Sequence, residues 1–215
     1  METQSTTPQA QPFNLQTRVV NILTKPKQEW PVIAAEPKDI AALYSKYIML
    51  LAAIPAICGA IGRVVIGVSV PFVGTYRAPF ASAIVGAVIQ YVGVLVGVYI
   101  CAFIIAKLAP SFQSEPDVAQ AAKLVAYSWT PAWVAGVLLL IPGLGLIVAL
   151  VSLYSIYLLY LGVSPLMKTP ADKVIVYLVV SAVIAIIVSL AIGAIAGVLL
   201  VAMGMGMSGL ARPTL

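Results

Sequence analysis

Five apolar runs, each long enough to cross a bilayer, constrain the fold of this chain more than any other feature. They cover residues 47–67, 80–106, 124–141, 143–162 and 174–203. A helix of about 20 residues spans the hydrocarbon core, because each residue rises about 1.5 Å. Lipid leaves unpaired backbone groups unsatisfied, and no strand-like period of two is present. The sequence therefore predicts an all-α polytopic membrane protein, a bundle of five transmembrane helices.

The composition agrees with this prediction and excludes an ordinary soluble domain. Of the 215 residues, 62% are hydrophobic and only 9% are charged, and the mean hydropathy is +1.07. A soluble domain carries about a quarter of its residues as charged side chains. Most of the surface must therefore face lipid.

The distribution of Lys and Arg predicts the orientation of the chain. Nine of the twelve lie in the amino-terminal segment and in the loops after the second and fourth runs, and three lie on the opposite side. All seven acidic residues lie on the nine-cation side. The positive-inside rule then predicts a multi-pass protein of the inner (cytoplasmic) membrane, with its amino terminus in the cytoplasm and its carboxyl terminus outside.

The sequence divides into four regions. The predicted boundaries are a disordered tail over 1–12, a cytoplasmic or interfacial segment over 13–40, the five-helix membrane domain over 41–203 and a short outer tail over 204–215. Within the second region, apolar residues at spacings of three and four predict an amphipathic helix over 13–23 that lies among the lipid headgroups.

Helix starts on the cytoplasmic side share a capping pattern. Ser114 and Thr169 are predicted N-caps, with Asp117 and Asp172 at the third helical position completing a capping box. Asp39 is predicted to cap the start of the first span. These acidic residues are thus interpreted as structural.

Basic and aromatic residues on the cytoplasmic side form a candidate surface for a protein partner or for lipid. Trp30 suits the membrane–water interface, and tyrosines recur every third residue at the inner end of the fourth run. An interfacial anchor and a docking surface for a partner both remain open. The candidate residues are Arg18, Lys25, Lys27, Trp30, Tyr157, Tyr160, Lys168 and Lys173.

The predicted spans contain few side chains that could serve in catalysis or bind an ion. The chain has no histidine, and the predicted spans contain no Asp or Glu, so catalytic residues, a metal site and a cofactor are not expected. Pro55 and Pro131 are predicted to bend their helices, and Gln90, Ser128 and Thr130 are the candidate polar patch beside them. An alternative function is therefore a small channel, transporter or lipid-moving protein.

Small residues predict close packing between helices. They recur at four-residue spacing in the second and fifth runs, where they let backbones approach. The candidates are Gly93, Gly97, Ser181, Ser189, Gly193 and Gly197. Packing within one chain and self-association into a homo-oligomer both remain open.

An ordered set of short motifs resembles the bacterial branch of the Yip family, which is named for interaction with Ypt/Rab GTPases. The set comprises TP at 130–131, IPGLG at 141–145, YSIYLLYLG at 154–162 and MKTPADK at 167–173. The amino-terminal stretch VVNILTKPKQEWPVIAAEP also resembles the segment before the first span in that branch. The resemblance covers about residues 18–190 and implies a five-helix domain with a cytoplasmic amino terminus.

These observations lead to one principal functional hypothesis. The chain is expected to be a non-enzymatic organiser or adaptor that acts through protein or lipid contacts at the cytoplasmic face. Its expected partners are the lipid bilayer and a membrane or cytoplasmic protein, and no nucleic-acid partner is expected.

Overall fold

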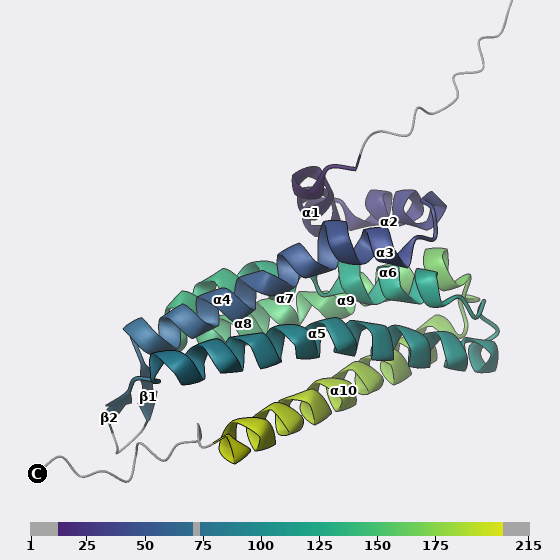
Figure 1. The fold of residues 1–215 in the computed structure, drawn as a ribbon. Coiled ribbons are helices and arrows are strands. Elements are labelled where there is room, and N and C mark those ends of the chain that lie inside the picture. The colour runs from purple at the N-terminus through teal and green to yellow at the C-terminus, as the bar shows by residue number, and fades with distance from the viewer. Residues whose placement is uncertain (1–12, 71–73, 204–215) are drawn as a thin grey trace, which may run out of the picture.

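The computed structural model describes residues 13–70 and 74–203, whose helices form an elongated bundle (Figure 1). Five helical segments of these residues are long and apolar enough to cross a membrane. They are Ile40–Val65, Phe80–Phe112, Val118–Leu140, Pro142–Met167 and Val174–Ala202. The predicted all-α bundle of five transmembrane helices is therefore confirmed. The tails predicted over 1–12 and 204–215 lie outside the described residues.

Most spans are assembled from shorter helical pieces. The first consists of α3 (Ile40–Leu43), the π-helical turn η1 (Tyr44–Ile48) and α4 (Met49–Val65). The second consists of α5 (Phe80–Leu108) and the 3-10 turn η2 (Ala109–Phe112), and the third of α6 (Val118–Ser128), α7 (Thr130–Ala135) and η3 (Gly136–Leu140). The fourth consists of η4 (Pro142–Leu144), α8 (Gly145–Ser152) and α9 (Tyr154–Met167), whereas the fifth is the single helix α10 (Val174–Ala202).

Proline accounts for the interruption of the third span. Pro131 has no N–H to donate to the carbonyl of Tyr127, four residues earlier, so α6 ends and α7 begins at this point. The Thr130 hydroxyl donates to that carbonyl at 2.8 Å and satisfies it. The predicted bend at Pro131 is thus a break between two helices, whereas Pro55 lies inside α4.

Two short helices precede the spans and lie against α9 and the α6–α7 junction (Figure 1). They are α1 (Leu15–Thr24) and α2 (Pro26–Ala35). Asn14 caps α1 by accepting a hydrogen bond from the Thr17 amide at 3.1 Å. The helix predicted over 13–23 is therefore confirmed. We call α1 and α2 together the amino-terminal cap.

The capping predictions are confirmed at Asp39, confirmed at Asp117 only in that this residue caps a helix, and wrong at the start of the fifth span. Asp39 accepts from the Ala42 amide and begins α3, so the first span starts seven residues before the predicted boundary. Asp117 is itself the N-cap of α6, because its carboxylate accepts from the amides two and three residues later. Ser114 therefore does not cap α6.

The start of the fifth span also differs from its prediction. Helix α10 begins at Val174 with no side-chain cap, so Thr169 and Asp172 form no capping box. The Thr169 hydroxyl instead lies 2.8 Å from that of Ser114. The side chains of Ser114 and Thr169 thus join the α5–α6 loop to the α9–α10 loop.

A short hairpin joins the first two spans at the end of the bundle remote from the cap (Figure 1). It pairs β1 (Val68–Val70) with β2 (Gly74–Tyr76) in antiparallel register, with Ser69 opposite Thr75. This hairpin is the one sheet in the described part of an otherwise helical chain.

Glycines set two close helix contacts. A methyl group at Gly62 would lie 2.2 Å from the Leu139 carbonyl oxygen, which shows how closely α4 approaches η3. On α5, a methyl group at Gly93 or Gly97 would lie 2.6 or 2.7 Å from Ile192 of α10. The large side chain of α10 therefore fits against the smooth surface of α5.

The small residues of α10 do not form one packed ridge. Ser181 is fully buried, whereas the side chain of Ser189 is exposed and donates to the Ala185 carbonyl of its own helix. A methyl group at Gly193 or Gly197 would meet no described atom within 4 Å. Within the described chain, the small residues that bring α5 and α10 close at Ile192 are thus the glycines of α5.

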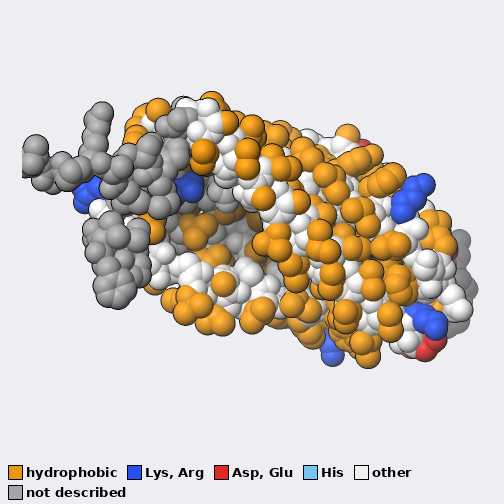
Figure 2. All heavy atoms as spheres, turned by 90° about the horizontal axis from the view of Figure 1, so that it is seen from below, with side chains coloured by type: hydrophobic (Ala, Val, Ile, Leu, Met, Phe, Trp, Pro, Cys, Tyr) orange, Lys and Arg blue, Asp and Glu red, His pale blue; other side chains and the backbone are white. Residues whose placement is uncertain are grey.

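The face formed by α5 and α10 is almost entirely hydrophobic, as a lipid-facing surface requires (Figure 2). Many of its large side chains are exposed, including Phe80, Val88, Ile186 and Leu190. Charged side chains gather toward the ends and margin of this face (Figure 2).

Candidate functional site

The amino-terminal cap is held together by a buried group of charges. Arg18 on α1 pairs with Glu29 on α2 at 2.5 Å and also with Glu36, which follows α2. The side chains of Arg18 and Glu29 are only 9% and 11% exposed. The Arg18 guanidinium also lies 5.8 Å from the centre of the Tyr127 ring. Charges this far from water require partners, so the ion pairs fix α1 against α2.

Two polar side chains of α6 attach the cap to the bundle. Lys123 donates to the carbonyls of Ile33 at 3.0 Å and Glu36 at 2.8 Å, and Gln120 donates to that of Ala34 at 3.1 Å. The last carbonyls of a helix have no partner inside it, and the negative end of its dipole attracts a cation. Lys123 and Gln120 therefore act as the carboxyl-terminal cap of α2.

Trp30 also attaches the cap to the spans, by packing against α6 and α9. Its ring is 1% exposed and meets the ring of Tyr127 edge to face, with 6.3 Å between their centres. A methyl group at Gly162 of α9 would lie 2.8 Å from the Trp30 ring and 2.7 Å from Leu124. The structure therefore places Trp30 in the protein core, and not at the surface expected for an interfacial anchor. Glycine is needed at this point of α9 to make room for it.

Part of the candidate surface lies where the cap meets α9. Tyr154 donates to the Leu23 carbonyl at the end of α1 at 3.0 Å, and its ring lies 5.5 Å from that of Tyr157. Tyr157 and Tyr160 are 41% and 44% exposed. The exposed residue Lys25 follows α1 directly, and the exposed residue Lys27 lies in the first turn of α2. We call Lys25, Lys27, Tyr157 and Tyr160 the basic–aromatic surface.

Lys168 and Lys173 lie at the opposite end of α9 and form a separate group. Lys168 pairs with Glu115 at 2.7 Å, and Lys173 lies 3.7 Å from its neighbour Asp172. Lys168 directly follows α9, eight residues beyond Tyr160, so about 12 Å of helix separates it from the nearer tyrosine of the basic–aromatic surface. The structure thus divides the eight candidate residues into two buried members, Arg18 and Trp30, and two separate exposed groups.

An ion pair beside this second group joins the cap linker to α6. Lys38 lies 2.5 Å from Asp117. Burial opposes ionisation of the Asp117 carboxyl, but hydrogen bonds from Lys38 and from two backbone amides outweigh it and lower its pKa. The same pair raises the pKa of Lys38. Both side chains are therefore charged at neutral pH.

The candidate polar patch of the spans is not assembled as one site. The Tyr47 hydroxyl donates to Thr130 at 2.6 Å, since the Thr130 hydrogen is used by the Tyr127 carbonyl. Ser128 is buried on the α6 side of a pocket that Gln90 does not line. In the described parts of the chain, no three His, Cys, Asp or Glu side chains gather to hold a metal ion.

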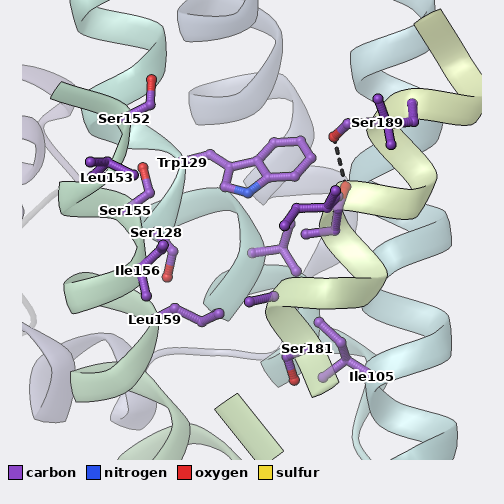
Figure 3. Close-up of a pocket in the computed structure, with 15 residues that line it drawn as sticks. Ile105, Ser128, Trp129, Ser152, Leu153, Ser155, Ile156, Leu159, Ser181 and Ser189 are labelled. Carbon is purple, nitrogen blue, oxygen red and sulfur yellow. Dashed lines mark hydrogen bonds between the residues drawn. The ribbon is translucent and has the colours of Figure 1, made fainter. Parts of the chain in front are cut away.

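The pocket lies between α6, α8, α9 and α10, with Ile105 of α5 at one side (Figure 3). Its volume is about 380 Å³, within the size range of small-molecule sites. Its walls are aliphatic, and the Trp129 ring extends across it (Figure 3). No ionisable side chain lines the pocket, and five serines contribute its hydroxyl groups. They are Ser128, Ser152, Ser155, Ser181 and Ser189.

Comparison with known proteins identifies the family. The Yip1 domain matches residues 20–193, which is most of the chain. The chain belongs to the Yip1 family. The resemblance carried by the motifs between Thr130 and Lys173 is thereby confirmed.

A named relative of this Yip1-family protein is the inner membrane protein YohC of Escherichia coli K12. It is 31% identical over 150 residues, which cover 68% of this chain and 77% of YohC. YohC of E. coli O6:H1 matches to the same extent. No solved structure matches the chain.

Several residues of this site could not be found from the sequence. By the charge pattern alone Lys123 is one of the loop cations, and no motif marks Ser155 or Trp129. Lys123 and Gln120 precede the apolar part of the third span, so a polar helix start was the available signal. No sequence pattern indicates that Ser128, Ser155 and Ser181 converge, because they lie on three different helices.

Proposed function

We propose that this Yip1-family protein is a non-enzymatic organiser of the cytoplasmic membrane that recruits a protein partner at the basic–aromatic surface. The observation that supports the proposal is the contrast between two parts of the cap. Buried ion pairs and Lys123 fix its inner side, while Lys25 and Lys27 of the cap and Tyr157 and Tyr160 of α9 remain exposed.

A surface of this kind suits protein recognition for two reasons. Its backbone is already ordered, so a partner binds without the entropic cost of folding a segment. Tyrosines contribute large contact areas at interfaces, and lysines attract an acidic segment of the partner. A partner with an acidic docking segment is therefore the chemical class that we propose.

The proposed location rests on charge. The positive-inside rule assigns the cap side to the cytoplasm, and the relative YohC is described as an inner membrane protein. A cap on that side would meet cytoplasmic proteins and the cytoplasmic domains of other membrane proteins.

Site-specific photo-crosslinking in native membranes tests the proposal. With benzoylphenylalanine in place of Tyr157, we expect ultraviolet light to trap a recurrent protein neighbour. The double variant Lys25→Glu, Lys27→Glu should lower the yield of that product severalfold, because it reverses the charge that attracts an acidic segment.

The matched control is Lys107→Glu, which changes an exposed lysine at the end of α5, away from the basic–aromatic surface. The yield of the crosslinked product from this variant should equal that from the protein with no lysine changed. Recovery of lipid adducts alone, or equal yields from all three proteins, would contradict recruitment of a protein at this surface.

The alternative of a channel or transporter built on Gln90, Ser128 and Thr130 has less support. Thr130 is committed to hydrogen bonds with Tyr47 and the Tyr127 carbonyl. Gln90 is not part of the pocket that Ser128 lines.

A further inference from the structure

Three serine hydroxyls in the pocket have no hydrogen-bond partner in the described chain. They are the Oγ atoms of Ser128, Ser155 and Ser181, and each is shielded from the surface. Ser128 is 1% exposed and Ser181 is fully buried. The three come from α6, α9 and α10 and line the same cavity (Figure 3).

Two neighbouring serines show what a serine in a membrane helix ordinarily does. Ser152 donates to the Val148 carbonyl and Ser189 to the Ala185 carbonyl, each at 2.7 Å within its own helix. Leaving a buried hydroxyl without a partner costs free energy, since the group loses its hydrogen bonds to water. All three such groups line one cavity, so a molecule that occupies the cavity would supply the partner that they lack.

The lining of the cavity restricts the chemistry of that molecule. No ionisable side chain lines the pocket, so a charged group would lose its hydration without gaining a counter-ion. The aliphatic walls and the Trp129 ring favour a hydrocarbon. Every lining residue lies in a segment long and apolar enough to span a membrane, which makes the lipid phase the source of the occupant.

We propose that the pocket binds an uncharged lipid whose oxygen atoms accept hydrogen bonds from Ser128, Ser155 and Ser181. Its hydrocarbon chain would lie along the walls formed by α9 and α10. Diacylglycerols and isoprenoid quinones share this chemistry, since both combine carbonyl oxygens with long hydrocarbon chains. This inference depends on the pocket alone and is independent of the partner proposed for the cap.

Photolabelling of the purified full-length protein tests the proposal. The protein is placed in vesicles of phosphatidylethanolamine and phosphatidylglycerol that contain a photoactivatable diacylglycerol, a photoactivatable quinone or a photoactivatable phosphatidylglycerol. We expect one of the uncharged probes to label peptides from α6, α9 and α10. The identity of that probe shows whether the occupant is a glyceride or a quinone.

The triple variant Ser128→Ala, Ser155→Ala, Ser181→Ala should reduce this labelling about tenfold, which corresponds to the loss of roughly 1.4 kcal/mol of binding free energy. The matched control Ser152→Ala, Ser189→Ala removes two hydroxyls that bond to their own helices, so its labelling should equal that of the parent protein.

Thermal unfolding in detergent separates ligand binding from folding. Because the triple variant loses hydroxyls that have no partner, it should be at least as stable as the parent without added lipid. Addition of the uncharged lipid that labels the parent should raise the unfolding temperature of the parent and not of the triple variant.

Three outcomes would overturn the proposal. They are equal labelling of the parent and the triple variant, labelling by the phosphatidylglycerol probe alone, and the absence of pocket labelling by any probe. The last result would assign the hydroxyls to trapped water.

Discussion

Gly62 is the residue at which an added methyl group would collide most severely with the backbone of another element. Its Cβ would lie 2.2 Å from the Leu139 carbonyl oxygen and 2.8 Å from that of Leu140. A flexible side chain can move away from such a contact, but these atoms belong to the backbone of η3. The whole contact between α4 and η3 would have to open.

We expect Gly62→Ala to lower the free energy of unfolding by about 1–3 kcal/mol, because the overpacked helices must separate. Thermal unfolding of the purified protein in detergent measures the change. Gly193→Ala is the matched control, since it adds the same methyl group to a helical glycine with no described atom within 4 Å of it. Equal unfolding temperatures for the two variants would show that α4 does not approach η3 so closely.

Residues whose partners lie nearby in the sequence are predictable from it, whereas residues whose partners lie far along the chain are not. Asp39 was predicted correctly as a cap because its partner, the Ala42 amide, lies three residues away. Trp30 was expected at the membrane interface because tryptophan favours that position and the surrounding segment carries Lys25 and Lys27. Its actual neighbours, Tyr127 and Gly162, come from other spans, and their proximity is not encoded in any local pattern.

At the scale of elements, the cap is the part of the molecule whose attachment depends on charge. Its inner side combines the Arg18 ion pairs with the hydrogen bonds that Lys123 makes to the end of α2. Breaking a buried ion pair by removing one partner costs about 3–5 kcal/mol, because the other charge stays buried and unpaired. Removal of Arg18 should therefore loosen the cap while the spans stay packed.

We expect Arg18→Met to raise the hydrogen-exchange rates of amides in residues 15–36 by roughly tenfold or more, while the amides of α5 and α10 exchange as before. Exchange measured by mass spectrometry on the purified protein resolves the two regions. Lys27→Met provides the control, because it removes a positive charge from the exposed side of the same cap. A uniform increase over the whole chain would mean that the cap is not a separate unit.

The ends of a span were predicted well where one uninterrupted apolar run defines the whole helix. The fifth span was placed to within a residue at each end, since nothing interrupts its apolar run. The fourth span continues to Met167, beyond the end predicted at 162, because Gly162 provides room for Trp30 and does not end the helix. A glycine that terminates a helix and one that accommodates a neighbour are identical in the sequence.

At the scale of the whole molecule, the cap and the β-hairpin lie toward opposite ends of the bundle (Figure 1). This arrangement agrees with the odd number of spans and with the charge distribution. It makes the predicted orientation directly testable.

We expect Lys27→Cys to react with a membrane-impermeant maleimide only after the cytoplasmic membrane is permeabilised, and Thr75→Cys to react in intact spheroplasts. Both positions are exposed. The background is labelling of the parent, whose Cys58 and Cys101 lie inside α4 and α5. The reverse pattern would place the amino terminus outside the cell and remove the cytoplasmic partner from consideration.

The attachment of the cap also sets an order of events during synthesis. The Ile33 carbonyl leaves the ribosome 90 residues before its partner Lys123, a delay of roughly 5–20 s at ordinary rates of translation. Throughout that interval, the carbonyls of Ile33 and Glu36 lack the partner that Lys123 later supplies. The first helices to be made are thus among the last to reach their final place, and a chaperone or nascent-chain factor has that interval in which to hold them.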